Sequence, residues 1–265
     1  MRQTTSPWLI GVTALAYLFL VGPIIIVIGA AFSDTGYLAF PPQGLTFKWF
    51  VNAWETTAFR RTFVTSLQVA TLATALSLLI GVPAAYAMNR FRGGMPAILS
   101  TVFVLPILVP EIVFGFSMLR SVAIGLDVPI LPALVLGHAL LVLPYTVRVT
   151  SASLASFDFS AEEAAVSLGV HPVKAFVTVV LPNIRAGLIA AFILAFITSL
   201  NDVSISLFLT GPGVSTLPIQ LLAYVEQFFD PTIASVSVLL MTLTVLVMAV
   251  VERTLGLSFM ARPSK

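Results

Sequence analysis

Two carboxylates stand inside long apolar stretches of the sequence. Glu111 directly follows Pro110, and Asp202 directly follows Asn201. A charged side chain at bilayer depth costs about 2.5–3.5 kcal/mol on insertion scales, so it is retained where it faces water, a cation or a partner group. We therefore predict that Glu111, Asn201 and Asp202 line a polar pathway. The alternative, in which each acid only completes a hydrogen bond between helices, stays open.

The remaining reactive side chains favour no catalytic or metal site. The chain contains no cysteine, which excludes thiolate metal sites, and its two histidines, His138 and His171, are too distant in sequence for a metal-ligand pair. We interpret His138 as a packing or hydrogen-bonding group within an apolar span. An intramembrane enzyme that uses Glu111 and Asp202 as facing carboxylates is the alternative from another class, and a passive channel is a third.

The polar segment 160–182 separates two apolar runs, and we predict two short helices in it at a membrane surface. A capping box between Ser160 and Glu163 is expected to begin the first helix, and Gly169 is expected to end it with a positive φ. Pro172 suits the first turn of the second helix. That helix is expected to stop before Pro182, because a residue that precedes proline is disfavoured in the α region.

Composition indicates a polytopic membrane protein. The chain is 58% hydrophobic and 9% charged, with a mean hydropathy of +1.06, which exceeds what a soluble core of 265 residues could bury. We predict an all-α fold in a single transmembrane domain, 1–265, with no nucleic-acid motif and with lipid as its surroundings. The predicted spans, each long enough to cross about 30 Å of hydrocarbon, cover residues 8–32, 63–88, 96–119, 131–151, 184–209 and 233–251.

Lysine and arginine are distributed unevenly between the two sides that six spans define. Nine fall on the side of the termini and of segment 160–182, whereas Lys48, Arg60, Arg61 and Arg120 fall on the other. The positive-inside rule therefore places both termini and segment 160–182 in the cytoplasm. A cleavable signal peptide is the competing interpretation of the first span, but no small-x-small cleavage site follows it.

Segment 160–182 carries a specific spacing. Glu163-Ala164-Ala165 is followed by three residues, then Gly169, then nine residues, then Val179-Val180-Leu181-Pro182. This pattern resembles the EAA loop of ABC importer permeases, and differs from it only by Val179 in place of isoleucine.

The resemblance implies a coupling helix that docks a separate nucleotide-binding ATPase. The residues concerned would be Glu162, Glu163, Ala164, Ala165, Gly169, Leu181 and Pro182. It also implies a second permease subunit and an extracytoplasmic solute-binding protein. The chain is not expected to be an enzyme or to hold a cofactor, because no lysine lies in a phosphate-binding loop; ATP and Mg²⁺ would belong to the ATPase.

Four further stretches are similar to permeases of the spermidine/putrescine type: 105–117, 137–144, 200–208 and 210–218. The resemblance implies a polyamine-like cation or an aminoalkyl or zwitterionic compound as the solute, with Glu111 and Asp202 near it. The fifth-span pair in those permeases resembles Asp-Asp, whereas this chain has Asn201-Asp202. Import of another small organic or anionic solute on the same scaffold is the alternative.

Overall fold

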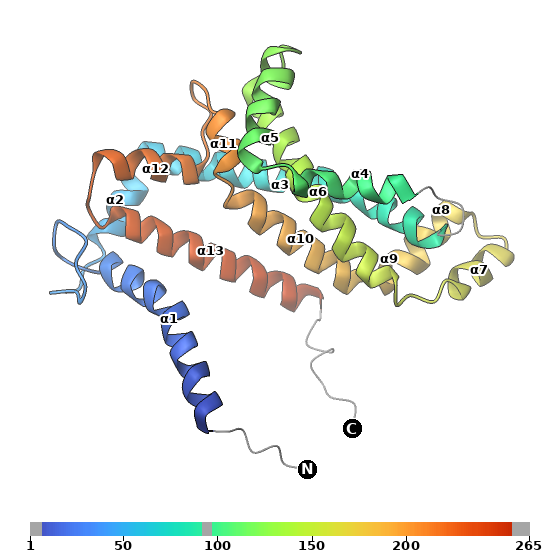
Figure 1. Cartoon of the computed structure of the whole chain (residues 1–265), viewed down its shortest axis with the longest axis horizontal. Helices are drawn as coiled ribbons and strands as arrows, with labels where there is room; N and C mark the ends of the chain where they lie inside the picture. The colour runs from blue at the N-terminus through green and yellow to red at the C-terminus, as the bar shows by residue number, and fades with distance from the viewer. Residues whose placement is uncertain (1–6, 92–96, 256–265) are drawn as a thin grey trace. The chain divides into compact units, whose positions relative to one another are not determined.

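A computed structural model describes residues 7–91 and 97–255, and these residues fold almost entirely into helices (Figure 1). The all-α prediction is therefore confirmed for this part of the chain. In chain order the helices are α1 (Pro7–Ala31), α2 (Lys48–Glu55), α3 (Thr57–Arg90), α4 (Ala97–Leu108), α5 (Glu111–Met118), α6 (Ile130–Leu154), α7 (Ser160–Ser167), α8 (Pro172–Ala175), α9 (Leu181–Asn183), α10 (Arg185–Leu200), α11 (Ser204–Phe208), α12 (Leu217–Gln227) and α13 (Thr232–Leu255), with π-helical turns at Leu119–Ile124 and Phe176–Val180.

Within the described ranges, five helical segments are long and apolar enough to cross a membrane. They are Trp8–Ala31, Thr57–Arg90, Ile130–Leu154, Arg185–Phe208 and Thr232–Val250. Five of the six predicted spans thus have a counterpart of suitable length. Six crossings stay a prediction, because the third predicted span, 96–119, forms no single long helix.

A break at Pro110 divides that third span. Helix α4 ends at Leu108, and Pro110 is the N-cap of α5 with an extended ψ of 127°. Proline has no N–H and its ring clashes with the carbonyl four residues earlier, so a new helix begins after it. Pro106, in contrast, lies inside α4. The sequence predicts that both prolines interrupt this span. That prediction is confirmed for Pro110 and wrong for Pro106.

The fifth span is also divided. Helix α10 ends at Leu200, residues 201–203 leave the helical path, and α11 begins at Ser204. The span predicted over 184–209 still has a counterpart of suitable length, Arg185–Phe208, with the break inside it. The break places Asn201 and Asp202 at a helix junction, where backbone groups need partners.

The chain groups into two compact units, each described by itself. One contains residues 62–219 together with the described residues from 245 onward, and α6 and α10 run side by side in it (Figure 1). Its core is built around Leu134, Val142 and Ile205. A second core around Val147, Leu154 and Val180 lies where α6 meets the segment after α7. That residues 1–265 form a single transmembrane domain stays a prediction.

The other unit contains the described residues up to 61 together with 220–244. The sequence predicts an amphipathic stretch within 33–61, between the first two spans, and α2 lies in this segment. Its Trp49 Nε1 donates to the Ser33 carbonyl at 2.8 Å, and its Asn52 amide donates to Thr232 Oγ1 at 2.9 Å. These bonds tie α2 to the ends of α1 and α13.

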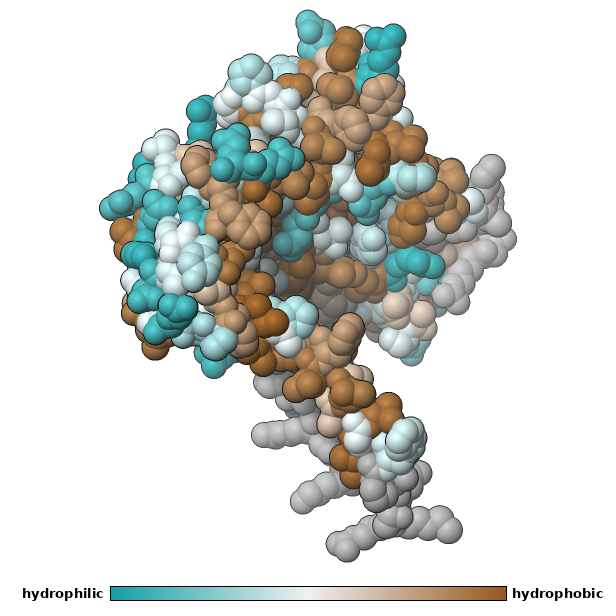
Figure 2. All heavy atoms as spheres, turned by 60° about the vertical axis from the view of Figure 1, so that its left-hand side comes forward, coloured by the Kyte–Doolittle hydropathy of each residue, from teal (hydrophilic) through white to brown (hydrophobic). Residues whose placement is uncertain are grey.

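Large apolar side chains lie on the surface in many places, as the face in Figure 2 shows. Helix α1 is the extreme case, with Trp8, Leu15 and Phe19 each more than half exposed. A helix that is apolar all round is stable in lipid or against other apolar helices, and not in water. The sequence also predicts a tight basic turn at 89–94. Of these residues, Asn89 and Arg90 belong to the end of α3, and 92–94 lie outside the described residues.

Candidate functional site

Helix α7 begins by a different device from the expected capping box. Phe159 is the N-cap, Ser160 already lies inside the helix, and no side chain caps it from the N-cap position. Instead Asp158 Oδ1 accepts from the Ser160 N–H at 3.0 Å, and this bond holds the pKa of Asp158 below its ordinary value. The capping-box prediction is wrong because Asp158, two residues upstream, satisfies the first free N–H.

The end of α7 agrees with the prediction. Gly169 has a φ of +90°, its N–H donates to the Val166 carbonyl at 2.9 Å, and the Val170 N–H donates to the Ala165 carbonyl at 3.1 Å. This pair of bonds is the Schellman arrangement, which places a left-handed residue directly after the helix. The positive φ fixes the direction in which the chain leaves α7.

The next helix begins at Pro172 as predicted, with His171 as its N-cap and with His171 Nδ1 accepting from the Val173 N–H at 3.3 Å. It does not stop before Pro182, so that prediction is wrong. The helical path continues through a π-helical turn, Phe176–Val180, and Pro182 enters the first turn of α9. A π turn widens the helix and relieves the clash that a proline ring makes with the preceding turn.

The most buried residue of α7 is an acid. The Glu162 side chain is 4% exposed and turns inward, where Tyr86 Oη donates to Glu162 Oε1 and Arg90 Nε lies 3.3 Å from Oε2. Glu162 Oε2 accepts no hydrogen bond from the described residues, so the guanidinium supplies its main stabilisation. A buried carboxylate needs such a partner, because desolvation of an unpaired charge costs several kcal/mol.

Glu163 points outward instead. Its side chain is 58% exposed, and Arg90 Nη2 reaches its Oε1 at 2.9 Å. One guanidinium on α3 therefore bridges both glutamates of α7. Outward-facing apolar groups continue from there, since Leu168 is 86% exposed and Val166 is exposed as well.

The predicted coupling residues thus divide between two faces. Glu162 faces the interior, whereas Glu163, Ala164, Gly169 and Pro182 are exposed, and Ala165 and Leu181 are half-buried. Tyr86 and Arg90 were missed by sequence reasoning. Their spacing of four residues places them on one face at the end of an α-helix, and that tyrosine–arginine pair was the only signal available.

Asp202 lies in the break between α10 and α11. Its Oδ2 accepts from the Ile205 N–H at 3.2 Å, the Ser206 N–H at 3.0 Å and the Ser206 hydroxyl at 3.1 Å. From the position before the N-cap residue, Val203, it therefore accepts from first-turn N–H groups of α11, as a capping side chain does. The carboxylate side chain is only 2% exposed.

His138 of α6 completes this cluster. Its Nδ1 lies 2.9 Å from Ser199 Oγ, its Nε2 lies 3.0 Å from Ser206 Oγ, and Nε2 lies 3.4 Å from Asp202 Oδ2. The interpretation of His138 as a hydrogen-bonding group is confirmed. The cluster joins α6, α10 and α11.

Glu111 and Asn201 have different surroundings from Asp202. Glu111 is the first residue of α5 and is exposed, and Asn201 is exposed with its amide donating to the Ile197 carbonyl at 2.9 Å. Glu111 is not among the partners of Asp202, so the structure gives no support to the two acids as a facing catalytic pair. Their role in a solute pathway stays a prediction.

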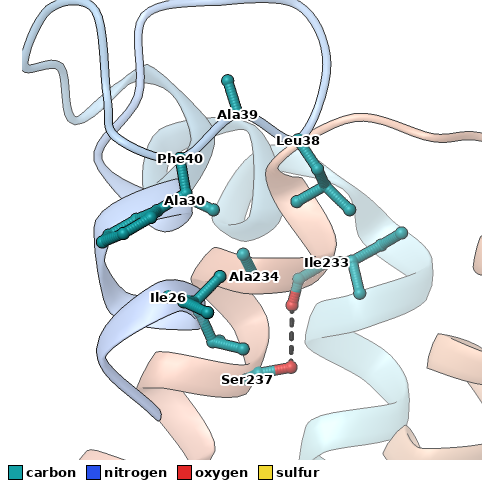
Figure 3. Close-up of a pocket in the computed structure, with 9 residues that line it drawn as sticks. Ile26, Ala30, Leu38, Ala39, Phe40, Ile233, Ala234 and Ser237 are labelled. Carbon is teal, nitrogen blue, oxygen red and sulfur yellow. Dashed lines mark hydrogen bonds between the residues drawn. The ribbon is translucent and has the colours of Figure 1, made fainter. Parts of the chain in front are cut away.

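One pocket of about 220 Å³ lies between α1, α13 and the loop at residues 38–40 (Figure 3). Its lining is mostly apolar and includes Ile26, Phe40 and Ile233. The single hydroxyl, Ser237 Oγ, donates to the Ile233 carbonyl at 2.9 Å. The pocket therefore offers no free polar group that could recognise a charged solute.

Residues 77–256 match the family model described as the binding-protein-dependent transport system inner membrane component. The chain belongs to this family. The matched region contains Arg90, α7, the His138 cluster and both sequence-predicted acids, so the permease features described above lie within the family's shared part. The chain is accordingly a permease component of an ABC importer.

Several relatives of this permease are named as transport proteins. It is 29% identical over 245 residues to the putrescine transport system permease protein PotI of Escherichia coli K12, covering 89% of this chain and 86% of that protein. It is 28% identical to the spermidine/putrescine transport system permease protein PotC of the same organism, covering 91% and 90%. It is 28% identical to the putative 2-aminoethylphosphonate transport system permease protein PhnV of Salmonella paratyphi A, covering 80% of each.

Two solved structures share the fold of this permease. A bacterial ABC transporter involved in the import of alginate matches with a TM-score of 0.70 at 18% identity, covering 92% of this chain and 93% of the other. The MetNI methionine transporter in an inward-facing conformation matches with a TM-score of 0.62 at 20% identity, covering 74% and 94%. At these identities the likeness shows the fold alone.

Proposed function

We propose that this permease imports a small organic amine, either a cation or an aminoalkyl zwitterion, by alternating access. A separate ATPase that holds ATP and Mg²⁺ docks on α7, and its closure moves α7 and changes which side of the helix bundle is open. A second permease chain completes the pathway, and an extracytoplasmic solute-binding protein delivers the solute. The chain crosses the bacterial inner membrane six times with both termini in the cytoplasm.

The form of α7 carries this proposal. The helix is anchored on its inner face by the buried Glu162 and ends at Gly169 with a positive φ, while Val166 and Leu168 are left exposed. An exposed apolar rim on a polar, membrane-adjacent segment is a surface that a partner protein covers. Because both ends of α7 are fixed, a force applied to its outer face would pass into the helices behind it.

The solute class is supported by chemistry that the relatives share. The relatives are named for transport of putrescine, spermidine and 2-aminoethylphosphonate. Each of these compounds carries a primary ammonium group. In this permease Glu111 is an exposed acid directly after the break in the third span, and Asn201 adds an exposed amide at the break in the fifth. An exposed carboxylate can pair with an ammonium at little desolvation cost, which the capped Asp202 cannot do without losing its partners.

The test uses the permease reconstituted with its cognate ATPase and solute-binding protein in liposomes. We expect ATP-dependent uptake of labelled putrescine, and no uptake when the ATPase is omitted. Uptake that proceeds without ATP would contradict ATP-driven import and favour a passive channel.

A competition series in the same liposomes addresses the alternative solute. Unlabelled putrescine, 2-aminoethylphosphonate and an anion without an amine, such as succinate, are compared at equal concentration. We expect the two amines to reduce uptake and succinate to have no effect. Competition by succinate alone would favour the anionic alternative on the same scaffold.

A further inference from the structure

A closed polar cluster lies inside the apolar core of the unit that contains residues 62–219. His138, Ser199, Asp202 and Ser206 are all buried, and the imidazole is completely enclosed. Leu134, Val142 and Leu209 belong to the core that surrounds it. Polar groups in such a setting are retained when each finds a hydrogen-bond partner.

The four side chains form a continuous hydrogen-bond chain. The Ser206 hydroxyl donates to Asp202 Oδ2, so its oxygen is left to accept from the N–H at His138 Nε2. With its proton on Nε2, the ring can accept at Nδ1 from the Ser199 hydroxyl. One ring proton is therefore enough to satisfy every member, and the assignment of that proton follows from the network.

We propose that His138 is a positioning residue that holds Asp202 in place as the cap of α11, and that Asp202 shapes the break in the fifth span instead of binding the solute. The inference deepens the proposed function and rests on it for the transport measurement below. It assigns the solute's charge recognition to Glu111 and leaves Asp202 a purely internal partner.

The packing around α11 leaves Asp202 little freedom to turn outward. A Cβ added at Gly115 of α5 would lie 2.9 Å from Ile205 Cα, and one added at Gly137 of α6 would lie 3.1 Å from Ile205 Cγ2. The backbone of α5 thus lies close to the backbone of α11, and the backbone of α6 lies close to the Ile205 side chain. Movement of α11 would have to disturb both contacts, because interiors packed this closely do not deform continuously.

The contacts of the two Asp202 carboxylate oxygens allow the capping role of this side chain to be tested separately from its charge. A single oxygen, Asp202 Oδ2, accepts from both backbone N–H groups and from the Ser206 hydroxyl, while Oδ1 has only the Ile205 N–H at 3.4 Å. An amide oxygen at the Oδ2 position would keep these bonds, and asparagine is as good an N-cap as aspartate. Alanine removes charge and cap together.

The first experiment measures putrescine uptake in the reconstituted importer. We expect Asp202→Asn to keep KM within about threefold of the unsubstituted chain, and Asp202→Ala and His138→Gln to lower the maximal rate about tenfold with little change in KM. The double variant Asp202→Ala/His138→Gln should be no slower than Asp202→Ala, because both changes remove one cap. A KM raised equally by Asp202→Asn and Asp202→Ala, with His138→Gln normal, would overturn the proposal.

A second measurement does not depend on the solute. It therefore tests the positioning role of His138 even if the proposed function is wrong. The chain has no cysteine, so Leu209→Cys, at a fully buried site just after α11, reports loosening through its rate of reaction with N-ethylmaleimide. We expect that rate to rise about tenfold with Asp202→Ala or His138→Gln and less than about threefold with Asp202→Asn. Ala195→Cys, buried in α10 before the break, is the matched control and should not change.

The two readouts distinguish the possible failures. If the unsubstituted chain imports no putrescine but the labelling pattern holds, the proposed solute is wrong and the positioning role stands. Equal labelling of the Leu209→Cys reporter in all backgrounds would remove the positioning role, whatever the solute.

Discussion

Arg90 Nη2 lies 2.9 Å from Glu163 Oε1, while Nε of the same side chain lies 3.3 Å from Glu162 Oε2. The end of α3 is thereby tied to the first turn of α7 across more than 70 residues of sequence. Arginine suits this double contact, because its planar group presents several donors in fixed directions, whereas a lysine presents a point charge.

The two ion pairs should differ in strength. Arg90→Ala would leave Glu162 buried without a cation, and removal of one partner of a buried pair costs about 3–5 kcal/mol. Glu163→Ala would break only the exposed pair, worth about 0.2–1 kcal/mol. Hydrogen exchange of the α7 amides should therefore accelerate strongly in Arg90→Ala and slightly in Glu163→Ala. Equal acceleration in both would contradict the anchoring role of Glu162.

Gly169 offers a test of coupling through backbone geometry. Its Cβ position is open, so Gly169→Val meets no neighbour but must adopt the unfavourable φ of +90°, at about 1–3 kcal/mol. We expect the Gly169→Val permease to insert normally and to lose ATPase binding or solute-stimulated ATP hydrolysis.

Gly169→Asn is the matched control, since asparagine tolerates a left-handed conformation. It should retain most of the coupling, measured as ATP hydrolysis with and without the loaded solute-binding protein. Normal ATP hydrolysis and transport in a Gly169→Val complex would contradict the interpretation of segment 160–182 as a coupling segment.

Glu111→Gln should weaken solute recognition without disturbing assembly. The exposed carboxylate is replaced by a neutral side chain of the same shape, so we expect a rise of about tenfold in KM for putrescine. Glu226→Gln, another exposed acid, on α12, is the control and should leave KM unchanged. An unchanged KM in Glu111→Gln would remove the electrostatic basis of the proposed solute class.

Asp158 predicts a pH dependence at the start of α7. Its folded pKa lies below the ordinary value of 3.8, because the charged carboxylate accepts from the Ser160 N–H. A depressed acid pKa contributes stability that is fully present above 3.8 and is lost as the pH falls through the folded pKa. Protection of the amides in the first turn of α7 against hydrogen exchange should thus decline only below pH 3.8. Asp158→Ala should abolish this pH-dependent decline.

The helical class, five long apolar spans and both ends of the Gly169 turn could be predicted from the sequence. These features depend on local signals: runs of apolar residues, a glycine at a positive φ and a proline in a first turn. The spacing around Glu163 also identified the family, because the docking segment is a short local pattern. No distant contact is needed for any of these.

The surroundings of the acidic side chains could not be predicted without the folded structure. Asp202 appeared as a charge in an apolar run, but the break after α10 turns it into a cap that His138 supports from α6. Glu162 and Glu163 are neighbours in sequence, yet one is buried against Arg90 and the other is exposed. The role of a charged group depends on its partners. Tyr86 and Arg90 beside Glu162, and His138 beside Asp202, lie 60 to 80 residues away in the sequence, so a local pattern could not reveal them.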